Sequence, residues 1–441
     1  MRKVIIGLCT LLALLIFSMP VAAADVTLDI NGHAYAPATA PQIQEGTTMV
    51  PLYLIEKISG ADVHIADQSI TIHKNDKTMA LTLGSTEATL NDEAMTLPQA
   101  PFKLGEEIMV PIRAIMEALG ATIGWNGETY TVLVNFQEKR DGMTPEELLL
   151  KSNEAILAFN TYKVKGNLDQ YMQIVNPETK ETEKMEMGMV MEMAMQNDPL
   201  LLYAQTSAST NLPDLDPTLA EAMDMEMVFN EEGLYTTMPG QGWVRMSLEG
   251  MDIKALLEEA SQDPLKSLQD FTDAGVLFCF GNDKEENGKS YWVINVTMGP
   301  ESFQKYLGQL MEQIPLVPGE PLAGEEMAQI LEQVLGNMKA DLFYSMWVDK
   351  DTLLPQYMDF KMNVNINIEV PGANPGEEQV IDMVMQQSGT YDYYGFDEPI
   401  EVPDLSNAID IEDLGNLDIK TEQAPEPQPS PADEVEQVIW S

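Results

Sequence analysis

The chain has 441 residues and carries 71 acidic against 24 basic side chains, which gives a formal net charge of −47 at pH 7. Negative charge on this scale repels nucleic acid and anionic lipid headgroups, so we expect no nucleic-acid partner. The three histidines are His33, His64 and His73. This inventory excludes a serine-histidine-aspartate triad, a cysteine-histidine pair or a three-histidine copper site in the chain after residue 73.

The first 24 residues have the pattern of a secretory signal peptide. Arg2 and Lys3 precede an apolar run over residues 4–17, and three alanines end at Ala24. We expect cleavage after Ala24 and a secreted or envelope-associated mature protein. Because no later apolar stretch approaches the roughly 20 residues needed to cross a bilayer, we expect no transmembrane span in the mature chain. Cleavage would leave Cys279 as its single cysteine, within an apolar run that predicts a buried strand.

An internal repeat organises the N-terminal part, with copies at about residues 45–75 and 105–136. The segment that starts with Met49-Val50-Pro51 matches the segment that starts with Met109-Val110-Pro111. Each copy predicts a strand ending in proline, a short amphipathic helix and a β-hairpin. Gly60 and Gly120 follow the last periodic residue of each helix, where glycine enters the left-handed conformation at low cost.

The second copy carries a family resemblance. Its Val-Pro-Ile-Arg segment, the Leu-Gly-Ala at the helix end and Trp125 resemble the copper amine oxidase N-terminal-like domain, a stalk domain of secreted bacterial proteins. The first copy departs from this pattern, with Tyr53 in place of Arg113 and Ile65 in place of Trp125. The resemblance implies a stalk domain over residues 25–136. It implies no oxidase chemistry, which in that family belongs to a different domain with copper, histidine ligands and a modified tyrosine.

Neither a metal site nor a catalytic pair stands out. His64 and His73 flank the predicted hairpin of the first copy, but two histidines without further ligands are more typical of surface residues. A calcium loop starting at Asp214 would need glycine and glutamate where Leu219 and Met225 stand. Carboxylates are so abundant that spacing selects no acid-base pair. We therefore predict no metal, no cofactor and no enzymatic activity, since an enzyme would need a carboxylate-only mechanism.

Residues 144–396 predict a second, larger domain of the α+β class. Thr144 is placed to cap a helix, and from Tyr162 onward apolar residues recur at every second position, which is typical of long half-buried strands. Residues 342–348 and 354–368 predict a hairpin. Helices are expected at about residues 252–271, 301–314 and 325–338. Together these elements predict a curved antiparallel sheet, a half-barrel, with covering helices.

Methionine is the unusual component of this region, with 30 in the whole chain. At every second position of a strand, methionines would share one face, and their unbranched thioethers adapt to irregular apolar shapes. Three interpretations stay open: a methionine-filled core without ligand, a groove for an acyl chain or other flexible hydrophobe, and thioether ligation of copper(I). The candidate lining residues of the groove are Met187, Met189, Met191, Met193, Met223, Met225, Met227, Phe229, Met358 and Met362.

The succession of a helix, long alternating strands and a late Val-Asp-Lys-Asp-Thr-Leu-Leu-Pro hairpin resembles the half-barrel of bacterial lipoprotein carriers of the LolA, LppX and LprG type. The resemblance implies a hydrophobic cavity for lipids. We therefore expect an exported, non-enzymatic envelope protein whose stalk presents a half-barrel that binds a lipid or other hydrophobic ligand. The alternative is an envelope structural or protein-interaction module with a filled methionine core and no ligand. Residues 401–441, acidic and proline-rich, predict a disordered tail.

Overall fold

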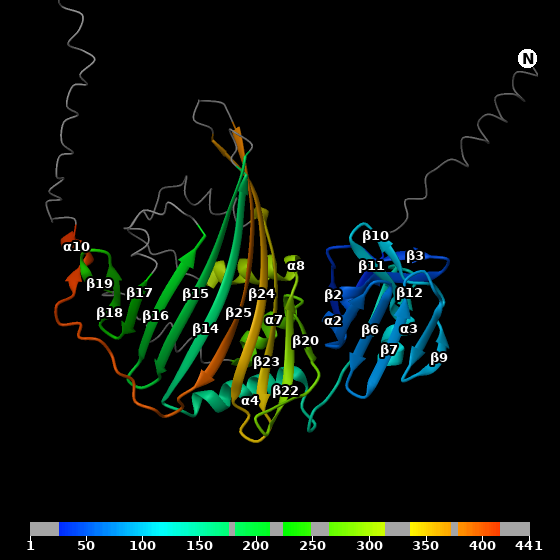
Figure 1. The fold of residues 1–441 in the computed structure, drawn as a ribbon, viewed down its shortest axis with the longest axis horizontal. Coiled ribbons are helices and arrows are strands. Elements are labelled where there is room, and N and C mark those ends of the chain that lie inside the picture. Colours follow the sequence, from blue (N-terminus) through cyan, green and yellow to red (C-terminus); the bar gives the residue numbers. More distant parts are fainter. Residues whose placement is uncertain are drawn as a thin grey trace, which may run out of the picture.

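The computed structural model describes residues 26–175, 181–211, 224–247, 264–313, 336–371 and 378–414 (Figure 1). The predicted signal peptide, Met223, residues 415–441 of the predicted tail and most of the helix expected at 325–338 lie outside these ranges. Residues 26–136 form a group of small sheets, and the later strands belong to one large sheet beside it (Figure 1).

The sequence repeat is also a structural repeat. The first copy consists of β4 (Thr47–Pro51), α2 (Leu52–Ser59), β5 (Asp62–Ala66) and β6 (Ser69–Lys74). The second consists of β11 (Glu107–Pro111), α3 (Ile112–Leu119), β12 (Thr122–Asn126) and β13 (Thr131–Asn135). Both helices end as predicted, because Gly60 (φ 63°) and Gly120 (φ 114°) adopt the left-handed conformation. β4 and β11 pair antiparallel with Val50 opposite Val110, so the copies meet in one sheet.

Seven further strands complete the small sheets: β1 (Thr27–Ile30), β2 (His33–Tyr35), β3 (Gln42–Gln44), β7 (Lys77–Thr82), β8 (Glu87–Leu90), β9 (Glu93–Thr96) and β10 (Phe102–Leu104). The strand orders are β12-β13-β1-β2, β10-β11-β4-β3 and β5-β6-β7-β8-β9. Ile55 of α2 and Ile115 of α3 are fully buried in the core that these sheets share. We refer to residues 26–136 as the stalk.

The chain then enters α4 (Pro145–Leu157), which begins where the sequence predicts it. The Thr144 hydroxyl accepts a hydrogen bond from the Glu147 amide, and the Glu147 carboxylate accepts one from the Thr144 amide. This reciprocal capping box satisfies two amides that the first helical turn leaves free. Leu148 of α4 is fully buried and belongs to a core cluster with Phe280.

The large sheet has thirteen strands: β14 (Thr161–Val175), β15 (Thr182–Gln196), β16 (Leu201–Thr210), β17 (Met225–Asn230), β18 (Gly233–Met238), β19 (Gly242–Ser247), β20 (Leu277–Phe280), β21 (Lys284–Glu286), β22 (Lys289–Met298), β23 (Met338–Asp349), β24 (Pro355–Pro371), β25 (Glu378–Tyr394) and β26 (Ile409–Asp410). Their order is β20-β22-β23-β24-β25-β14-β15-β16-β17-β18-β19-β26, with β21 beside β22. The accompanying helices are α7 (Pro264–Asp273), α8 (Pro300–Gln313) and α10 (Ile411–Leu414).

The predicted fold class is confirmed: the molecule is α+β, with a curled and almost wholly antiparallel half-barrel sheet (Figure 1). The expected hairpin is present, with β23 and β24 joined by a turn at residues 350–354. The sequence predicts a disordered tail from residue 401 onward, but residues 401–414 are ordered in the structure. There β26 pairs with β19, and the Arg245 guanidinium donates two hydrogen bonds to the Asp410 carboxylate, at 2.5 and 2.9 Å.

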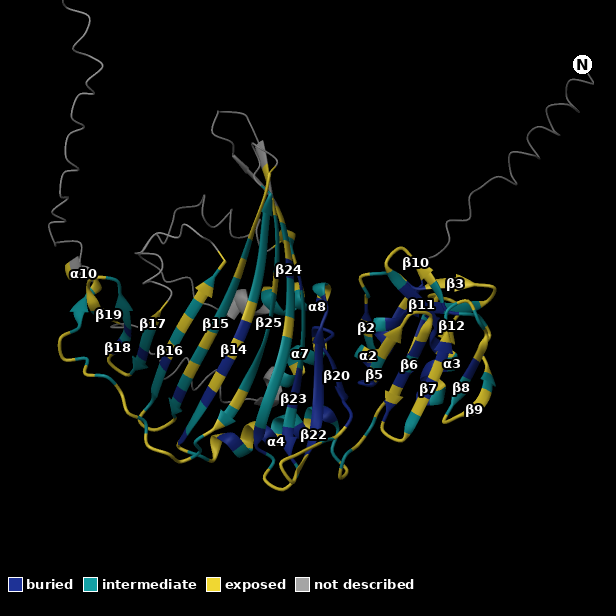
Figure 2. Cartoon of the chain, viewed as in Figure 1, coloured by how far each residue is buried: buried dark blue, intermediate teal, exposed yellow. Residues whose placement is uncertain are grey.

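Helices cover one face of the sheet at the end formed by β20, β22 and β23. Leu148 of α4, Phe271 of α7 and Tyr306 of α8 pack in the cluster that contains Phe280 and Ile294, both fully buried. Figure 2 shows β20 and β22 buried over most of their length, whereas β14, β15 and β16 are largely half-buried or exposed. The sheet therefore has a filled end and a more open end.

The stalk packs on the other face of the same filled end. The Cys279 thiol of β20 lies 3.5 Å from the Lys57 carbonyl of α2. Leu277, also on β20, joins the hydrophobic core of the stalk. At this end the sheet is thus enclosed between the helices and the stalk.

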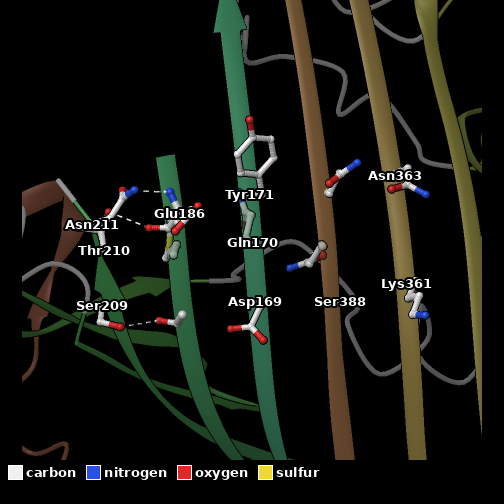
Figure 3. Close-up of a pocket in the computed structure, with 14 residues that line it drawn as sticks. Asp169, Gln170, Tyr171, Glu186, Ser209, Thr210, Asn211, Lys361, Asn363 and Ser388 are labelled. Carbon is white, nitrogen blue, oxygen red and sulfur yellow. Dashed lines mark hydrogen bonds between the residues drawn. The ribbon is translucent and has the colours of Figure 1, made fainter. Parts of the chain in front are cut away.

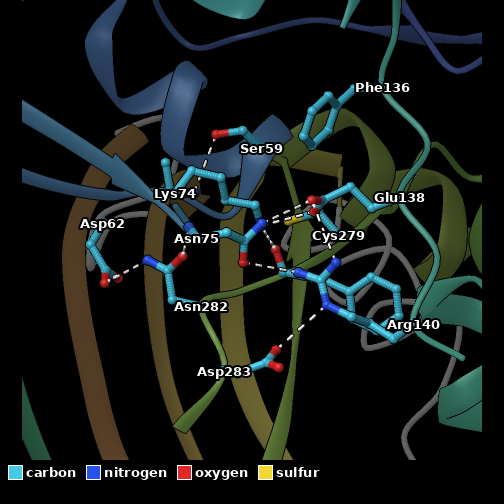
Figure 4. A network of polar contacts seen from close by, with 12 residues as sticks. Ser59, Asp62, Lys74, Asn75, Phe136, Glu138, Arg140, Cys279, Asn282 and Asp283 are labelled. Carbon is cyan, nitrogen blue, oxygen red and sulfur yellow. Dashed lines mark hydrogen bonds and ion pairs between the residues drawn. The ribbon is translucent and has the colours of Figure 1, made fainter. Parts of the chain in front are cut away.

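A polar network ties the stalk to the large sheet (Figure 4). The Lys74 ammonium, whose side chain is 1% exposed, donates to the Phe280 carbonyl and pairs with Glu138 at 2.9 Å. The Asn282 amide donates to the Asp62 carboxylate at 2.8 Å and to the His73 carbonyl at 3.0 Å. Because these bonds join β5, β6 and the segment before α4 to β20 and its following loop, they fix the stalk on the sheet.

Candidate functional site

Strand register determines which side chains of the large sheet share a face. Directly opposed residues in neighbouring strands point to the same side, and successive residues alternate. Nine of the ten candidate lining residues are described, and all nine lie on one face, the face that carries the helices at the filled end. We call it the apolar face and the opposite side the polar face.

Three rows across the strands show the arrangement. One row runs Met358, Tyr391, Gly166, Met191, Thr206, Met225 from β24 to β17. The next runs Tyr393, Val164, Met193, Ala204, Met227 from β25 to β17. A third runs Met362, Gln387, Gln170, Met187, Thr210 from β24 to β16. Met189 lies on the same face, in the row between those of Met191 and Met187. Phe229 also lies on this face, in the row next to that of Met227.

The apolar face also carries aromatic residues that are not among the candidates predicted from the sequence. Phe360 and Tyr391 stack with ring centroids 5.6 Å apart. A side chain at Gly166 would meet the Tyr391 ring, and one at Gly389 would meet the Phe360 ring, so the two glycines leave room for rings that lie over the sheet. The alternation of apolar residues in residues 378–394 was the available signal. Burial raises the pKa of Tyr393 to about 12, with the neighbouring Tyr162 adding to the shift, which places its hydroxyl in weakly polar surroundings.

The open end of the apolar face is not fully covered. Met187, Met189, Met191 and Met193 are each half-buried, and Met225 is 42% exposed. On the same face at the filled end, Ile294 and Phe280 have no exposed surface. Apolar surface that keeps contact with water in this way is the feature expected of a binding surface for a hydrophobic molecule.

A groove of about 690 Å³ lies along β14, β15, β16, β24 and β25, mainly on the polar face (Figure 3). Four residues of the apolar face also contribute to its lining: Gln170, Met187, Thr210 and Gln387. Side chains of Asp169, Glu186, Lys361, Asn363 and Ser388 line it, a mixture of amide, hydroxyl and charged groups. Met187 is the one candidate residue in its lining. No pattern in the sequence predicts this groove, because polar residues alternating along a strand predict only a side that faces water.

The described residues contain no group of three or more histidine, cysteine, aspartate or glutamate side chains that could hold a metal ion. His64 and His73 are both exposed, and His73 Nδ1 lies 3.0 Å from the Thr78 hydroxyl. In the described ranges no helix is both long and apolar enough to cross a membrane.

Two family models match the chain. The model of the copper amine oxidase N-terminal domain matches residues 29–178, which confirms the resemblance carried by the second repeat. A model described as a family of unknown function, DUF6612, matches residues 144–407. The two matches overlap over α4 and β14. A search of curated proteins found no match.

Solved structures with similarity to the chain include bacterial lipoproteins. LppX of Mycobacterium tuberculosis aligns with 10% identity over 59% of this chain and 98% of its own, with a TM-score of 0.29. LprF of Mycobacterium bovis aligns with 11% identity over 59% of this chain and 96% of its own, with a TM-score of 0.28. Lipovitellin aligns with 6% identity over 56% of this chain and 26% of its own, with a TM-score of 0.22.

Proposed function

We propose that this chain, which belongs to the family of unknown function DUF6612, binds a lipid or other hydrophobic ligand on the apolar face of its large sheet. The observation that carries the proposal is the register: nine described candidate residues, far apart in sequence, converge on one half-exposed apolar face. The function is non-enzymatic, since binding there needs no reacting group. Met223, the tenth candidate, is included in the proposed lining on its sequence position alone.

The energetics favour a flexible apolar ligand. Removing apolar surface from water contributes about 25 cal/mol per Å². A ligand that covers about 200 Å² of the apolar face would gain roughly 5 kcal/mol from this contact. Methionine side chains adapt to different shapes, so the same face can accept chains of different length or branching.

The proposed setting is the cell envelope. The pattern of residues 1–24 supports export and cleavage after Ala24. Residues 25–136 form the proposed stalk domain and 144–396 the proposed binding domain. The family match over residues 144–407 and the change from small sheets to one large sheet support this division. In this arrangement the stalk spaces or holds the binding domain, and an envelope component is its proposed partner.

One observation favours the alternative of a filled core without ligand. At the filled end, α4, α7 and α8 already occupy the apolar face, and packing of the same kind over β14 to β17 would leave no room for a ligand. The protein would then be a structural or interaction module of the envelope.

Native mass spectrometry of the full chain purified from its own host, before and after organic extraction, separates the two functions. A bound mass that disappears on extraction supports ligand binding and identifies the ligand class. A single ligand-free mass, together with no binding of a fluorescent fatty-acid probe, would leave the filled core as the better description.

A matched pair of variants locates the binding surface. Met191→Glu places a carboxylate on the apolar face, and Val190→Glu places one on the polar face one residue away, where Val190 is 44% exposed. We expect Met191→Glu to lose the bound mass and to bind the fatty-acid probe at least about tenfold more weakly, because a charge without a partner is costly in apolar surroundings. Val190→Glu should behave like the original chain. Equal effects of the two variants would contradict the assignment of the face.

A further inference from the structure

Two glutamines interrupt the apolar face at one place. Gln170 of β14 and Gln387 of β25 are direct register partners across the β14–β25 pair, although they are far apart in the sequence. Both side chains are half-buried. Directly opposed residues of antiparallel strands lie about 4.5–5.5 Å apart at Cα, so the two amides are close enough to contact one small chemical group together.

Apolar residues surround the pair along the sheet. Met187 lies beside Gln170 on β15, and Met362 lies beside Gln387 on β24. Two residues further along their own strands, Met172 and Met385 form the next opposed pair on the same face. The glutamines are therefore a polar position inside the apolar face, not part of its edge.

The amide groups of the pair are unengaged. No described residue forms a hydrogen bond with the side chain of Gln170 or of Gln387, and the two side chains do not bond to each other. Glutamines elsewhere do find partners: the Gln196 amide donates to the Pro199 carbonyl, and the Gln173 carbonyl accepts from the Tyr171 hydroxyl. Because both amides are half-buried, a polar group of a ligand bound on this face would replace water as their hydrogen-bond partner.

The chemistry of that group follows from the pair. Each amide has both donors and an acceptor and carries no charge. At the positions of β14, β24 and β25 that share the apolar face, the sequence has no charged residue that could pair with a phosphate, carboxylate or ammonium group. An ester, amide or hydroxyl group matches such a site, whereas a charged group would lie there without a counter-charge.

We propose that Gln170 and Gln387 bind an uncharged hydrogen-bonding group, an ester, amide or hydroxyl, within an otherwise hydrophobic ligand. This inference rests on the proposed function. It makes the ligand a neutral amphiphile whose polar group lies on the open part of the apolar face, with its hydrocarbon extending over the methionines on either side. An acyl ester is the simplest member of this class.

Competition between two matched ligands tests the inference. Diphenylhexatriene, which has no hydrogen-bonding group, reports binding to the apolar face by fluorescence. Methyl palmitate and heptadecane, similar in length but with and without an ester, then compete for it. We expect methyl palmitate to displace the probe from the full chain at about tenfold lower concentration than heptadecane, the effect of one or two net hydrogen bonds.

The variant Gln170→Leu/Gln387→Leu should bind diphenylhexatriene at least as tightly as the original chain and should lose the preference for the ester. Gln173→Leu/Gln386→Leu changes the same residue type on the same two strands, on the polar face, and should keep the preference. Gln387→Met, which matches its methionine neighbours, provides a second variant should the double substitution impair folding.

The outcomes for the two proposals are distinct. If the original chain binds neither diphenylhexatriene nor either competitor, the proposed function itself is overturned, and this inference with it. If the chain binds the probe but the two competitors are equally effective, or if Gln170→Leu/Gln387→Leu retains the preference, hydrophobic binding stands and the role of the glutamine pair is overturned.

Discussion

Lys74 shows how a single residue connects the stalk to the large sheet. Its side chain is among the most deeply buried of the described part of the chain, yet it is charged. Burial of an ammonium group is tolerated only when partners compensate for the lost water, and here the Phe280 carbonyl and the Glu138 carboxylate do so. Arg140 lies near the same carboxylate at 3.7 Å, and its guanidinium lies over the Phe280 ring.

We expect Lys74→Met to lower the free energy of unfolding by about 3 kcal/mol. This value is at the lower end of the range for removing one partner of a buried ion pair, because Arg140 still faces the Glu138 carboxylate. Urea denaturation measures the change. Lys103→Met, at an exposed lysine of β10, should change stability by less than about 0.5 kcal/mol. Adding Glu138→Gln to Lys74→Met should restore part of the loss, and a double variant less stable than the single one would contradict the ion-pair argument.

Asp349 controls the turn between β23 and β24. Its carboxylate accepts hydrogen bonds from the amides of Asp351 and Thr352, at 3.0 Å each, and faces Lys289 at 3.4 Å. Burial raises the pKa of this carboxyl, but the hydrogen bonds outweigh that effect, and the net result is a pKa below the ordinary value of 3.8.

A carboxyl whose pKa is lower in the folded state stabilises the fold above its unfolded pKa, and this contribution is lost as the pH falls through the folded value. We therefore expect Asp349→Asn, which keeps an oxygen acceptor but not the charge, to be about 1 kcal/mol less stable than the original chain at pH 7. The difference should shrink at pH 3. Asp351→Asn, at an exposed position, serves as the control. If the difference in stability between Asp349→Asn and the original chain stays constant between pH 7 and pH 3, the charge of the Asp349 carboxylate does not contribute to stability.

At the scale of elements, the two repeat helices end alike but have different surroundings. Gly60 and Gly120 both adopt positive φ. A Cβ at Gly60 would overlap with the Phe280 carbonyl of β20, whereas at Gly120 the nearest atom is the end of the Lys77 side chain at 3.4 Å. The first repeat therefore docks its helix end on the large sheet, and the second does not.

We expect Gly120→Ala to cost about 1–2 kcal/mol, the cost of a side chain in the left-handed conformation. Gly60→Ala carries the same cost plus that of overlap in a packed interface, and should be destabilising by about 1–3 kcal/mol more. Thermal or urea unfolding of the two variants gives the comparison. Equal losses of stability in the two variants would mean that α2 and β20 can move apart with little loss of free energy.

Sequence periodicity was a good guide to faces and a poor guide to partners. Alternation placed the methionines of β15 on one side of a strand, and the register confirms a common face. It could not show that Gln170 stands opposite Gln387, because that pairing depends on which distant strand closes beside β14. The different environments of Gly60 and Gly120 were equally hidden, since the surrounding sequences of the two repeats are so similar. The pairing of β26 with β19 was hidden as well, because it joins an acidic, proline-rich segment to a distant strand, with one ion pair between Arg245 and Asp410 beside it.

At the scale of the whole molecule, the large sheet is covered unequally. Around β20 and β22 it lies between the helices and the stalk, so both faces are buried (Figure 2). Around β14 to β17 the apolar face retains contact with water in the described part of the chain. Stable domains are built from at least two packed layers, so a hydrophobic ligand would act as the missing layer at the open end. The two ends of the sheet therefore differ in their cover: one is packed on both faces, and the other is where the proposed ligand would bind.

The net charge of −47 acts on the molecule as a whole. Mutual repulsion of the carboxylates opposes the compact state and is long-ranged at low ionic strength, since the Debye length falls from about 30 Å at 0.01 M to about 8 Å at 0.15 M salt. The pair of Lys74 and Glu138 is buried and therefore little affected. Screening should thus remove more repulsion than attraction, and we expect the melting temperature to rise by about 2–4 °C between 10 and 300 mM sodium chloride. Circular dichroism at fixed pH measures it, with sucrose of equal osmolality as the control. A melting temperature that falls with salt would mean that attractive surface pairs outweigh the repulsion.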